Sequence, residues 1–301
     1  MTDAIKSKTM KRFMGINNRD NATRIDPVVA NHEYVYPLSQ GMNVDIDNTF
    51  GLSSRSGYTS VITGTDIHSL WSEKGKCLLV DGYTLFALNP DFSAVEIRAG
   101  LMLKARMSYA LVNDRIYWTN GNEIGNVRGF ESFALQDPGI EFKQPLPPGQ
   151  LIEIYRGCLY VAKGNVLYIS DPLCDYYDIR RGYRVFSNDI TLLRAVDDGI
   201  YVGDDKIWWV KGDTPEQFDR LEVYGVPAII HTAVRVNGQY VGDGVKGNVA
   251  IWTGTNGICV GDNSGSVINA TEPRFTMDAS GEGAAFIREK SGVRQYINSL
   301  Y

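Results

Sequence analysis

Short apolar runs separated by polar turns recur along this chain at a nearly constant interval. One phrase appears five times: an apolar strand, a turn rich in Asp, Asn or Gly, and a second apolar strand. The spacings between phrases are 39, 43, 41 and 39 residues, measured between the anchors Leu78, Tyr117, Tyr160, Tyr201 and Tyr240. Because Asp-Gly and Asn-Gly supply the positive φ of tight hairpin turns, each phrase predicts two antiparallel strands.

Further apolar runs flank these phrases. A preceding strand is predicted at 106–112, 151–155, 191–196 and 232–236, and a following strand at 93–97 and 218–223. Four short strands in about 40 residues is the period of a β-propeller blade. A β-sandwich also has many short strands, but it would not repeat one hairpin phrase at near-constant spacing. The sequence therefore predicts an all-β chain with a single β-propeller.

The two ends of the chain carry incomplete units. Residues 284–287 and 295–297 predict a hairpin without outer strands, and residues 42–46 and 58–62 predict two strands without an inner pair. If both ends share one blade, strand pairing joins the termini and leaves no open edge. This arrangement predicts six blades over residues 34–301, or seven if the N-terminal strands form a blade of their own. Residues 1–33 show no clear periodicity and are expected to form an extended N-terminal arm, either mobile or held by a neighbouring subunit.

Composition narrows the function classes. The chain has 301 residues, 31 glycines and 17 tyrosines. Its formal net charge is −5, so the charge does not indicate a basic nucleic-acid-binding surface. The basic stretch from Lys6 to Arg12 is interpreted as a solvated leader, with a contact to nucleic acid or an acidic neighbour as the alternative. No run approaches the roughly 18 apolar residues of a membrane span, and residues 1–12 lack the apolar core of a signal peptide.

Cysteine and histidine offer no obvious chemistry. The cysteines are far apart, form no C-x-x-C pair and are expected to be free in a reducing cytosol, at Cys77, Cys158, Cys174 and Cys259. His32, His68 and His231 show no metal-ligand spacing, and no G-x-S-x-G elbow supports a serine nucleophile. No cofactor and no metal are expected.

Three motifs look functional and have simpler interpretations. Residues 242–247 match G-x-G-x-x-G, but a strand rather than a helix follows, so the motif predicts a hairpin turn. Asp45 and Asp47 begin like a calcium loop whose later positions fail, which favours turn capping or a contact between subunits. The acid pairs 197–198 and 204–205 sit in turns at the two ends of one strand, where Asp commonly makes local hydrogen bonds. A polar and aromatic loop at 171–183 contains Tyr176 and Tyr177 and is interpreted as a solvated loop or a partner-binding loop.

The N-terminal third resembles a family of structural proteins encoded by tailed bacteriophages. The phrases that carry this resemblance lie in order at residues 13–18, 42–48, 52–58, 68–72 and 106–109. The resemblance implies a virion protein of the tail, synthesised in the bacterial host cytoplasm, with a propeller of the nozzle or hub type. Copies of such proteins form a ring around the DNA exit channel beside other virion proteins. The family has no catalytic residues to carry over, so no enzyme is expected.

The residues expected to contact other subunits or partners are Phe13, Ile16, Asn17, Asn18, Asp45, Asp47, Arg55, Tyr176 and Tyr177. An acidic chain also suits a channel through which genomic DNA passes without specific binding, because Lys and Arg contacts to phosphate are what retain DNA. Two alternatives remain open at this point. The many Tyr, Trp and Asn residues would suit a carbohydrate- or receptor-binding propeller, and the acid pairs would suit a polysaccharide-degrading enzyme.

Overall fold

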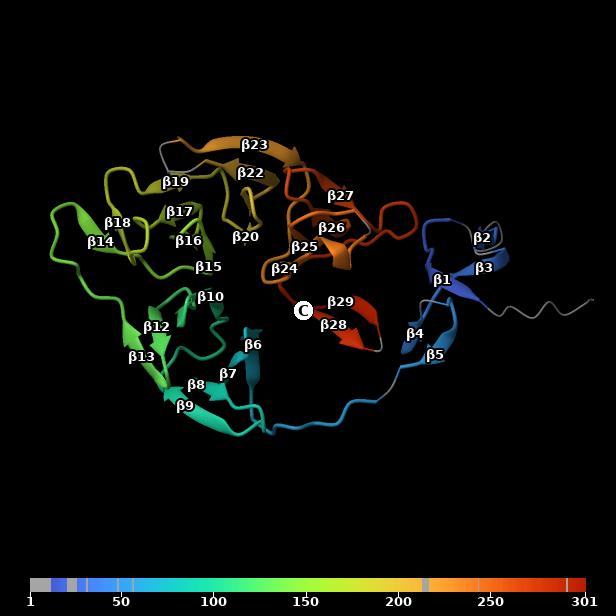
Figure 1. Ribbon diagram of the computed structural model, residues 1–301, viewed down its shortest axis with the longest axis horizontal. Helices are drawn as coiled ribbons and strands as arrows, with labels where there is room; N and C mark the ends of the chain where they lie inside the picture. The colour runs from blue at the N-terminus through green and yellow to red at the C-terminus, as the bar shows by residue number, and fades with distance from the viewer. Residues whose placement is uncertain are drawn as a thin grey trace, which may run out of the picture.

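The structure is a computed structural model in which nearly all regular secondary structure is β-strand (Figure 1). It describes residues 12–20, 26–30, 32–47, 49–55, 57–212, 217–242, 244–290 and 292–301. No helix in these ranges is long and apolar enough to cross a membrane.

Five consecutive four-stranded antiparallel sheets form the body of the protein, and we number them as blades 1 to 5. Blade 1 contains β6 (Ile67–Glu73), β7 (Lys76–Asp81), β8 (Thr84–Leu88) and β9 (Ala94–Arg98), and blade 2 contains β10 (Ser108–Val112), β11 (Arg115–Thr119), β12 (Ile124–Arg128) and β13 (Glu131–Ala134). Blade 3 contains β15 (Leu151–Tyr155), β16 (Cys158–Lys163), β17 (Val166–Ile169) and β19 (Tyr183–Val185). Blade 4 contains β20 (Leu192–Ala195), β21 (Ile200–Gly203), β22 (Ile207–Lys211) and β23 (Asp219–Tyr224), and blade 5 contains β24 (Val234–Asn237), β25 (Asn248–Gly254), β26 (Gly257–Gly261) and β27 (Val267–Asn269).

The first strand of each blade faces the centre of the ring, and the fourth lies at its rim (Figure 1). Neighbouring blades are held together by apolar side chains that alternate along the strands and meet between two sheets. The boundaries are filled by Trp118 between blades 1 and 2, Val161 between blades 2 and 3, Ile200 between blades 3 and 4, and Trp252 between blades 4 and 5. Each of these side chains is at most 1% exposed, and burying a side chain of this kind contributes about 1.5–3 kcal/mol.

Four of the five sequence anchors occupy the second strand of a blade, as predicted, and the expected outer strands at 93–97 and 218–223 correspond to β9 and β23. The prediction for the fifth phrase is wrong. Tyr240 lies in a 3-10 turn, η2 (Gly238–Tyr240), and β25 takes the position of the second strand. The physical reason is an inserted loop: the amide of Gly238 donates to the carbonyl of Gly247 at 2.7 Å and closes it, while the Asn237 side chain caps the turn.

An N-terminal module precedes the blades. It consists of a sheet of β1 (Phe13–Ile16), β3 (Glu33–Leu38) and β2 (Val28–Ala30), in that order, and a hairpin of β4 (Val44–Ile46) and β5 (Leu52–Ser54). The expected boundary of the arm at residue 33 therefore falls inside a sheet. The strand expected at 58–62 is absent, and residues 57–66 run without regular structure from the module to β6 (Figure 1). Residues 1–11 of the expected arm lie outside the described part of the chain.

The C-terminal hairpin of β28 (Gly283–Lys290) and β29 (Val293–Leu300) follows blade 5 and packs on it through Ile287 and Tyr296. The expected pairing of N- and C-terminal strands is not found among the described strands, because each group satisfies its backbone groups within its own small sheets. Side chains connect the two ends instead. Asp45 lies 3.2 Å from Arg288, and the Asn18 side chain donates to the Thr276 carbonyl at 2.9 Å.

Charged side chains from the first strands meet at the centre of the ring. Glu153 of β15 is 2% exposed and accepts a hydrogen bond from Arg194 of β20 at 2.9 Å. Arg235 of β24 lies 4.0 Å from Glu153 and 3.7 Å from Glu73 of β6. This axial cluster links blades 1, 3, 4 and 5 across the axis, so the centre is held by ion pairs rather than by an apolar core.

Candidate functional site

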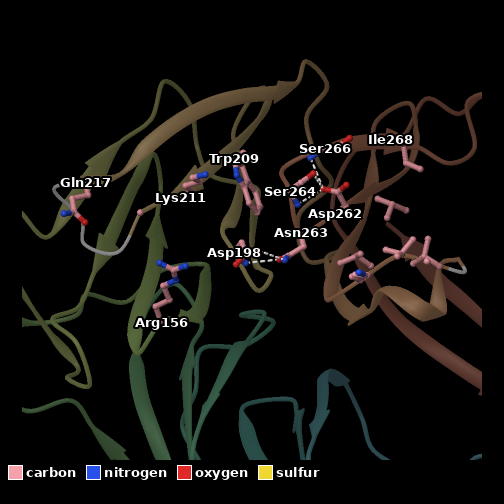
Figure 2. A pocket seen from close by; sticks show the side chains of 17 residues that line it. Arg156, Asp198, Trp209, Lys211, Gln217, Asp262, Asn263, Ser264, Ser266 and Ile268 are labelled. Atoms are coloured by element: carbon pink, nitrogen blue, oxygen red, sulfur yellow. Dashed lines mark hydrogen bonds between the residues drawn. The ribbon is translucent and has the colours of Figure 1, made fainter.

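A groove of about 980 Å³ lies between blades 4 and 5 (Figure 2). Blade 4 contributes Trp209 and Lys211, and blade 5 contributes the turn at Asp262 and the loop that contains Lys246. Arg156, in the turn between β15 and β16 of blade 3, closes one end. Residues of blades 3, 4 and 5 therefore line the groove together.

The wall from blade 5 is a rigid turn built around Asp262. Its carboxylate accepts hydrogen bonds from the amide and hydroxyl of Ser264, both at 2.7 Å, and from the amide of Ser266 at 3.0 Å. Burial raises the pKa of Asp262, but these hydrogen bonds outweigh it, and the pKa lies below its ordinary value. The Asp262 carboxylate is therefore ionised at neutral pH, and its Oδ1 atom accepts three hydrogen bonds within its own turn.

Beneath this turn lies Tyr201 of β21, a fully buried tyrosine. Its hydroxyl donates to the carbonyl of Asp262 at 2.7 Å and lies 3.1 Å from that of Ser266. Burial raises the pKa of this hydroxyl, so it stays a donor. Glycine is required above the ring, because a Cβ at Gly261 would lie 2.5 Å from it. The sequence signal for this contact was only a glycine in an apolar strand.

Hydrogen bonds of the acid pair 197–198 join the two blades beside the groove, which Asp198 lines. Asp197 accepts hydrogen bonds from the amide and side chain of Asn248, at 2.8 and 2.6 Å. Asp198 and Asn263 bond each other twice, at 2.9 and 2.6 Å (Figure 2). These acids make hydrogen bonds as predicted, but the expectation of local partners is wrong, because Asn248 and Asn263 belong to the neighbouring blade.

The other acid pair lies at the opposite end of β21. Asp204 is 2% exposed and accepts hydrogen bonds from Trp208 Nε1 at 2.9 Å and from the Lys206 amide at 3.2 Å. Because β21 separates the two pairs, they do not converge on one cleft. Both pairs serve the packing of blade 4.

The G-x-G-x-x-G match at 242–247 forms part of the groove's rim, with Asp243 outside the described residues. It connects β24 to β25, and Gly244 and Gly247 have φ of 87° and 75°. Because the strand β25 follows, no helix N-terminus is present to meet a pyrophosphate. The motif connects two paired antiparallel strands, as predicted, but the strand before it is β24 rather than the expected strand at 239–241.

Chemically, the groove offers hydrogen-bond donors above an apolar floor. The carboxylates of Asp198 and Asp262 already accept hydrogen bonds, whereas the exposed cations Arg156, Lys211 and Lys246 project at its rim. The described residues contain no group of three or more His, Cys, Asp or Glu side chains placed to hold a metal ion. Such a groove can bind a polar ligand through donated hydrogen bonds.

The histidines and cysteines are scattered, as the sequence suggested. Burial lowers the pKa of His231 to about 4, with Arg106 adding to the effect, so this imidazole is neutral at physiological pH. All four cysteines are free, and burial raises the pKa of Cys259 to about 11, which makes it an unreactive core residue.

Asn17 and Asn18, at the end of β1, were expected to contact a partner, and the structure uses both within the chain. Asn17 is 7% exposed and its side-chain oxygen accepts from the amides of Arg19 and Asp20. Asn18 exchanges three hydrogen bonds with Arg274 and Thr276, between 2.8 and 3.0 Å. Asn18 thus fastens the N-terminal module to the loop after blade 5. Phe13 and Ile16 are half-buried in β1.

The residues of the β4–β5 hairpin have similar roles. Asp45 accepts a hydrogen bond from Arg55 at 3.0 Å and pairs with Arg288 of the C-terminal hairpin. Asp47 caps its own turn, accepting from the amide and hydroxyl of Thr49 and the amide of Gly51. Turn capping by Asp47 is confirmed, and a contact of these residues with another subunit stays a prediction.

Tyr176 and Tyr177 belong to a strand rather than to a solvated loop. They lie in β18 (Tyr176–Asp178), which pairs with β14 (Lys143–Pro145), and Tyr177 packs edge-on against Tyr168 at 5.2 Å between ring centres. Asp178 anchors this small sheet. Its carboxylate is 2.7 Å from Arg180 and 3.3 Å from Lys143, and hydrogen bonds from Arg180 hold the pKa of Asp178 well below its ordinary value.

We expect this carboxylate to make folding sensitive to acid. Because the pKa of Asp178 is lowered in the folded state, its contribution is present above about pH 4 and is lost as the pH falls through the folded-state pKa. Asp178→Asn should be less stable than wild type at neutral pH and should lose less stability on acidification. Melting temperatures measured between about pH 7 and pH 2.5 test this. Asp137→Asn, in an exposed turn, is the control and should follow the wild-type profile; a parallel profile for Asp178→Asn would refute the assignment.

Exposed apolar side chains concentrate in one segment, which we call the apolar segment, residues 28–70. Nine of the 27 large apolar side chains exposed in the described part of the chain fall there. They are Val28, Val29, Tyr34, Met42, Leu52, Tyr58, Val61, Ile67 and Leu70. Exposed fractions reach 81% for Met42 and 75% for Tyr58, although the blades nearby bury residues of the same kind. Exposed apolar side chains that gather on one surface mark sites of protein association.

The chain is similar in fold to several solved structures. No family model matches the chain, and no curated protein matches it. A solved complex of BBS1N with ARL6DN aligns with a TM-score of 0.51 and 11% identity, over 83% of this chain and 81% of that chain. A gluconolactonase from Xanthomonas campestris aligns with a TM-score of 0.45 and 12% identity, over 74% of this chain and 80% of that chain. The WD40 β-propeller domain of Doa1 aligns with a TM-score of 0.42 and 13% identity, over 67% of each chain. At these identities the likeness concerns the fold alone. The five consecutive four-stranded antiparallel sheets around one centre define an all-β protein of the β-propeller class.

Proposed function

We propose that this chain is a structural subunit of a bacteriophage tail, of the nozzle or hub type, that assembles in several copies around or next to the DNA exit channel. Its ring comprises six blades in this proposal, the sixth being the C-terminal hairpin. The partners are other virion proteins and further copies of the chain, and the protein acts in the virion without a catalytic step.

The apolar segment is the observation that carries this proposal. It falls in the same N-terminal third that resembles phage structural proteins, and its exposed side chains would be covered in an assembly. The blades supply a rigid body, because apolar boundaries and the axial cluster fix their positions. The module held by Asn18 and Asp45 then presents the apolar segment outward in one orientation.

Particles released from the host that carries the gene provide the test. Mass spectrometry of purified particles should find the wild-type chain in several copies per particle. A double variant, Met42→Asp with Val61→Asp, should fold but be depleted from particles at least tenfold, whereas Leu221→Asp, on the exposed rim of blade 4, should be incorporated normally. Absence of the wild-type chain from particles, or equal incorporation of all three, would refute the proposal.

A second function, binding of a carbohydrate or other receptor, is favoured by the groove between blades 4 and 5. Its exposed cations and apolar floor suit a ligand rich in hydroxyl groups, such as a host surface glycan. On a glycan array, a double variant with Lys211→Ala and Lys246→Ala should bind at least tenfold more weakly than wild type. Lys163→Ala, exposed on blade 3, is the control. A wild-type protein that binds no glycan would remove this candidate.

A further inference from the structure

The C-terminal hairpin is an incomplete blade of two strands, and the outer edge of its second strand, β29, is open among the described strands. Each of the five preceding blades has four strands, whereas β28 pairs only with β29, and no described strand pairs with the other edge of β29. Glu282 and Tyr301 exchange both of their backbone hydrogen bonds, at 3.1 and 3.0 Å. Because bonded and non-bonded pairs alternate in an antiparallel ladder, the backbone groups that point away from β28 are those of Arg294, Tyr296, Asn298 and Leu300.

One face of this hairpin is covered near its turn, where Arg288 and Gln295 contact Asp45, and is exposed at Phe286. Ile287 and Tyr296 pack on blade 5, so the alternate residues Phe286 and Ile297 point the other way, toward blade 1. Phe286 is 56% exposed, and Leu70 on β6 of blade 1 is 68% exposed. Apolar clusters fill the boundary on the other side of the hairpin and all those between blades, but among the described residues none joins the hairpin to blade 1. The seam between β28–β29 and β6 therefore combines an open edge with a face that is exposed at Phe286.

The edge carries few of the features that prevent strand addition. β29 has eight residues, no proline and a single charged side chain, Arg294. Edge strands of this length are normally shortened, kinked, charged or covered. The aromatic ring of Tyr58 borders the seam, because its hydroxyl is 3.3 Å from Arg288 of β28, and it is itself 75% exposed. The open edge is thus continuous with the apolar segment.

Among the described strands, β2 is another edge strand with no partner on its outer side. In the sheet β1-β3-β2, the amide of Tyr36 donates to the carbonyl of Arg12 on the β1 side at 3.0 Å. Because backbone groups of successive residues in a strand point to opposite sides, the backbone groups of Val35 and Glu33 point toward β2. Val29 lies opposite Tyr34 and therefore points its backbone groups outward. Its side chain is 63% exposed. β2 lies on the side of the N-terminal module away from β29 (Figure 1), so the two edges cannot meet within one chain.

We propose that β29 of one copy accepts β2 of a second copy as an added strand, with the apolar side chains beside β2 covering the seam at Phe286. Two different edges on opposite sides of one chain form a head-to-tail contact, which propagates into a ring or a filament. This inference rests on the proposed function and adds how copies join. Main-chain hydrogen bonds supply most of the contact, as in other cases of strand addition.

Proline substitutions test the two edges separately. Asn298→Pro removes an outward amide of β29, and Val29→Pro removes the outward amide of β2, while the ladders inside each copy keep their bonds. In sedimentation experiments, wild type should form dimers and larger species, and each proline variant alone should associate at least tenfold more weakly. Asn298→Ala and Val29→Ala, which keep the amides, are the matched controls and should remain closer to wild type.

Mixing the variants gives the decisive result. Asn298→Pro retains an intact β2, and Val29→Pro retains an intact β29, so the mixture should form a one-to-one dimer that grows no further. Association of Val29→Pro at wild-type strength, or a wild type that stays monomeric at about 100 µM, would overturn the inference. A monomeric chain that is nevertheless found in particles would leave the proposed function intact, so the two failures are distinguishable.

Discussion

Replacing Glu153 with alanine should lower the free energy of unfolding by about 3 kcal/mol, because it leaves Arg194 and Arg235 near the axis without their shared carboxylate. Breaking a buried ion pair costs more than the pair itself contributes, since the remaining charge keeps its desolvation penalty. For a chain of this size the loss corresponds to a fall in Tm of roughly 6 °C. Thermal denaturation followed by circular dichroism measures it.

The matched control for this prediction is Glu222→Ala. Glu222 pairs with Lys206 at 2.9 Å, but its side chain is 48% exposed, so its loss should cost less than about 1 kcal/mol. If the two variants melt together, the axial cluster does not hold the blades. If Glu153→Ala melts much earlier, the ring depends on contacts that cross its centre.

Replacing Trp252 with alanine should be the largest change in the apolar core, at about 4 kcal/mol, or roughly 8 °C in Tm. This side chain is fully buried between blades 4 and 5, with its ring 5.4 Å from that of Tyr201. The loss combines the transfer of the indole to water with the cavity it leaves. Because Tyr201 also supports the Asp262 turn, the groove should be disturbed as well.

Trp252→Phe separates packing from hydrogen bonding. The indole Nε1 of Trp252 is buried and has no hydrogen-bond partner among the described residues. Phenylalanine fills much of the same space and removes this unsatisfied donor, so it should cost clearly less than alanine. Trp208→Ala, at a half-buried position of the neighbouring blade 4, is the comparison and should cost less than Trp252→Ala. Equal losses for Trp252→Phe and Trp252→Ala would contradict this account.

The repeat could be predicted from the sequence because it depends on local chemistry. Leu78, Tyr117, Tyr160 and Tyr201 all lie in second strands and are at most 6% exposed. Tyr240 has the same local pattern, yet it is 44% exposed in a 3-10 turn. Four glycines between 238 and 247 allow the chain to form a closed loop there. The second strand of blade 5 therefore begins about ten residues later than the pattern predicts.

The sequence contains a regular signal for the axial cluster. Glu153, Arg194 and Arg235 are spaced by 41 residues and interrupt apolar runs at one position of successive first strands. A charge inside an apolar strand indicates a special position, but the period alone does not say that these positions meet at an axis. The bonds from Asp197 and Asp198 to Asn248 and Asn263 were hidden for the same reason, since their partners lie about 50 and 65 residues away.

By itself, the sequence determined the all-β class, the blade period and four of the five repeated hairpins, because each depends on residues close together in the chain. Only the tertiary structure decided whether the N- and C-terminal strands pair with each other. Whether terminal strands pair with each other depends on which backbone groups remain free after local sheets have formed. Here β4 and β28 are satisfied by β5 and β29, so the termini meet through Asp45 and Arg288, and the outer edge of β29 remains open.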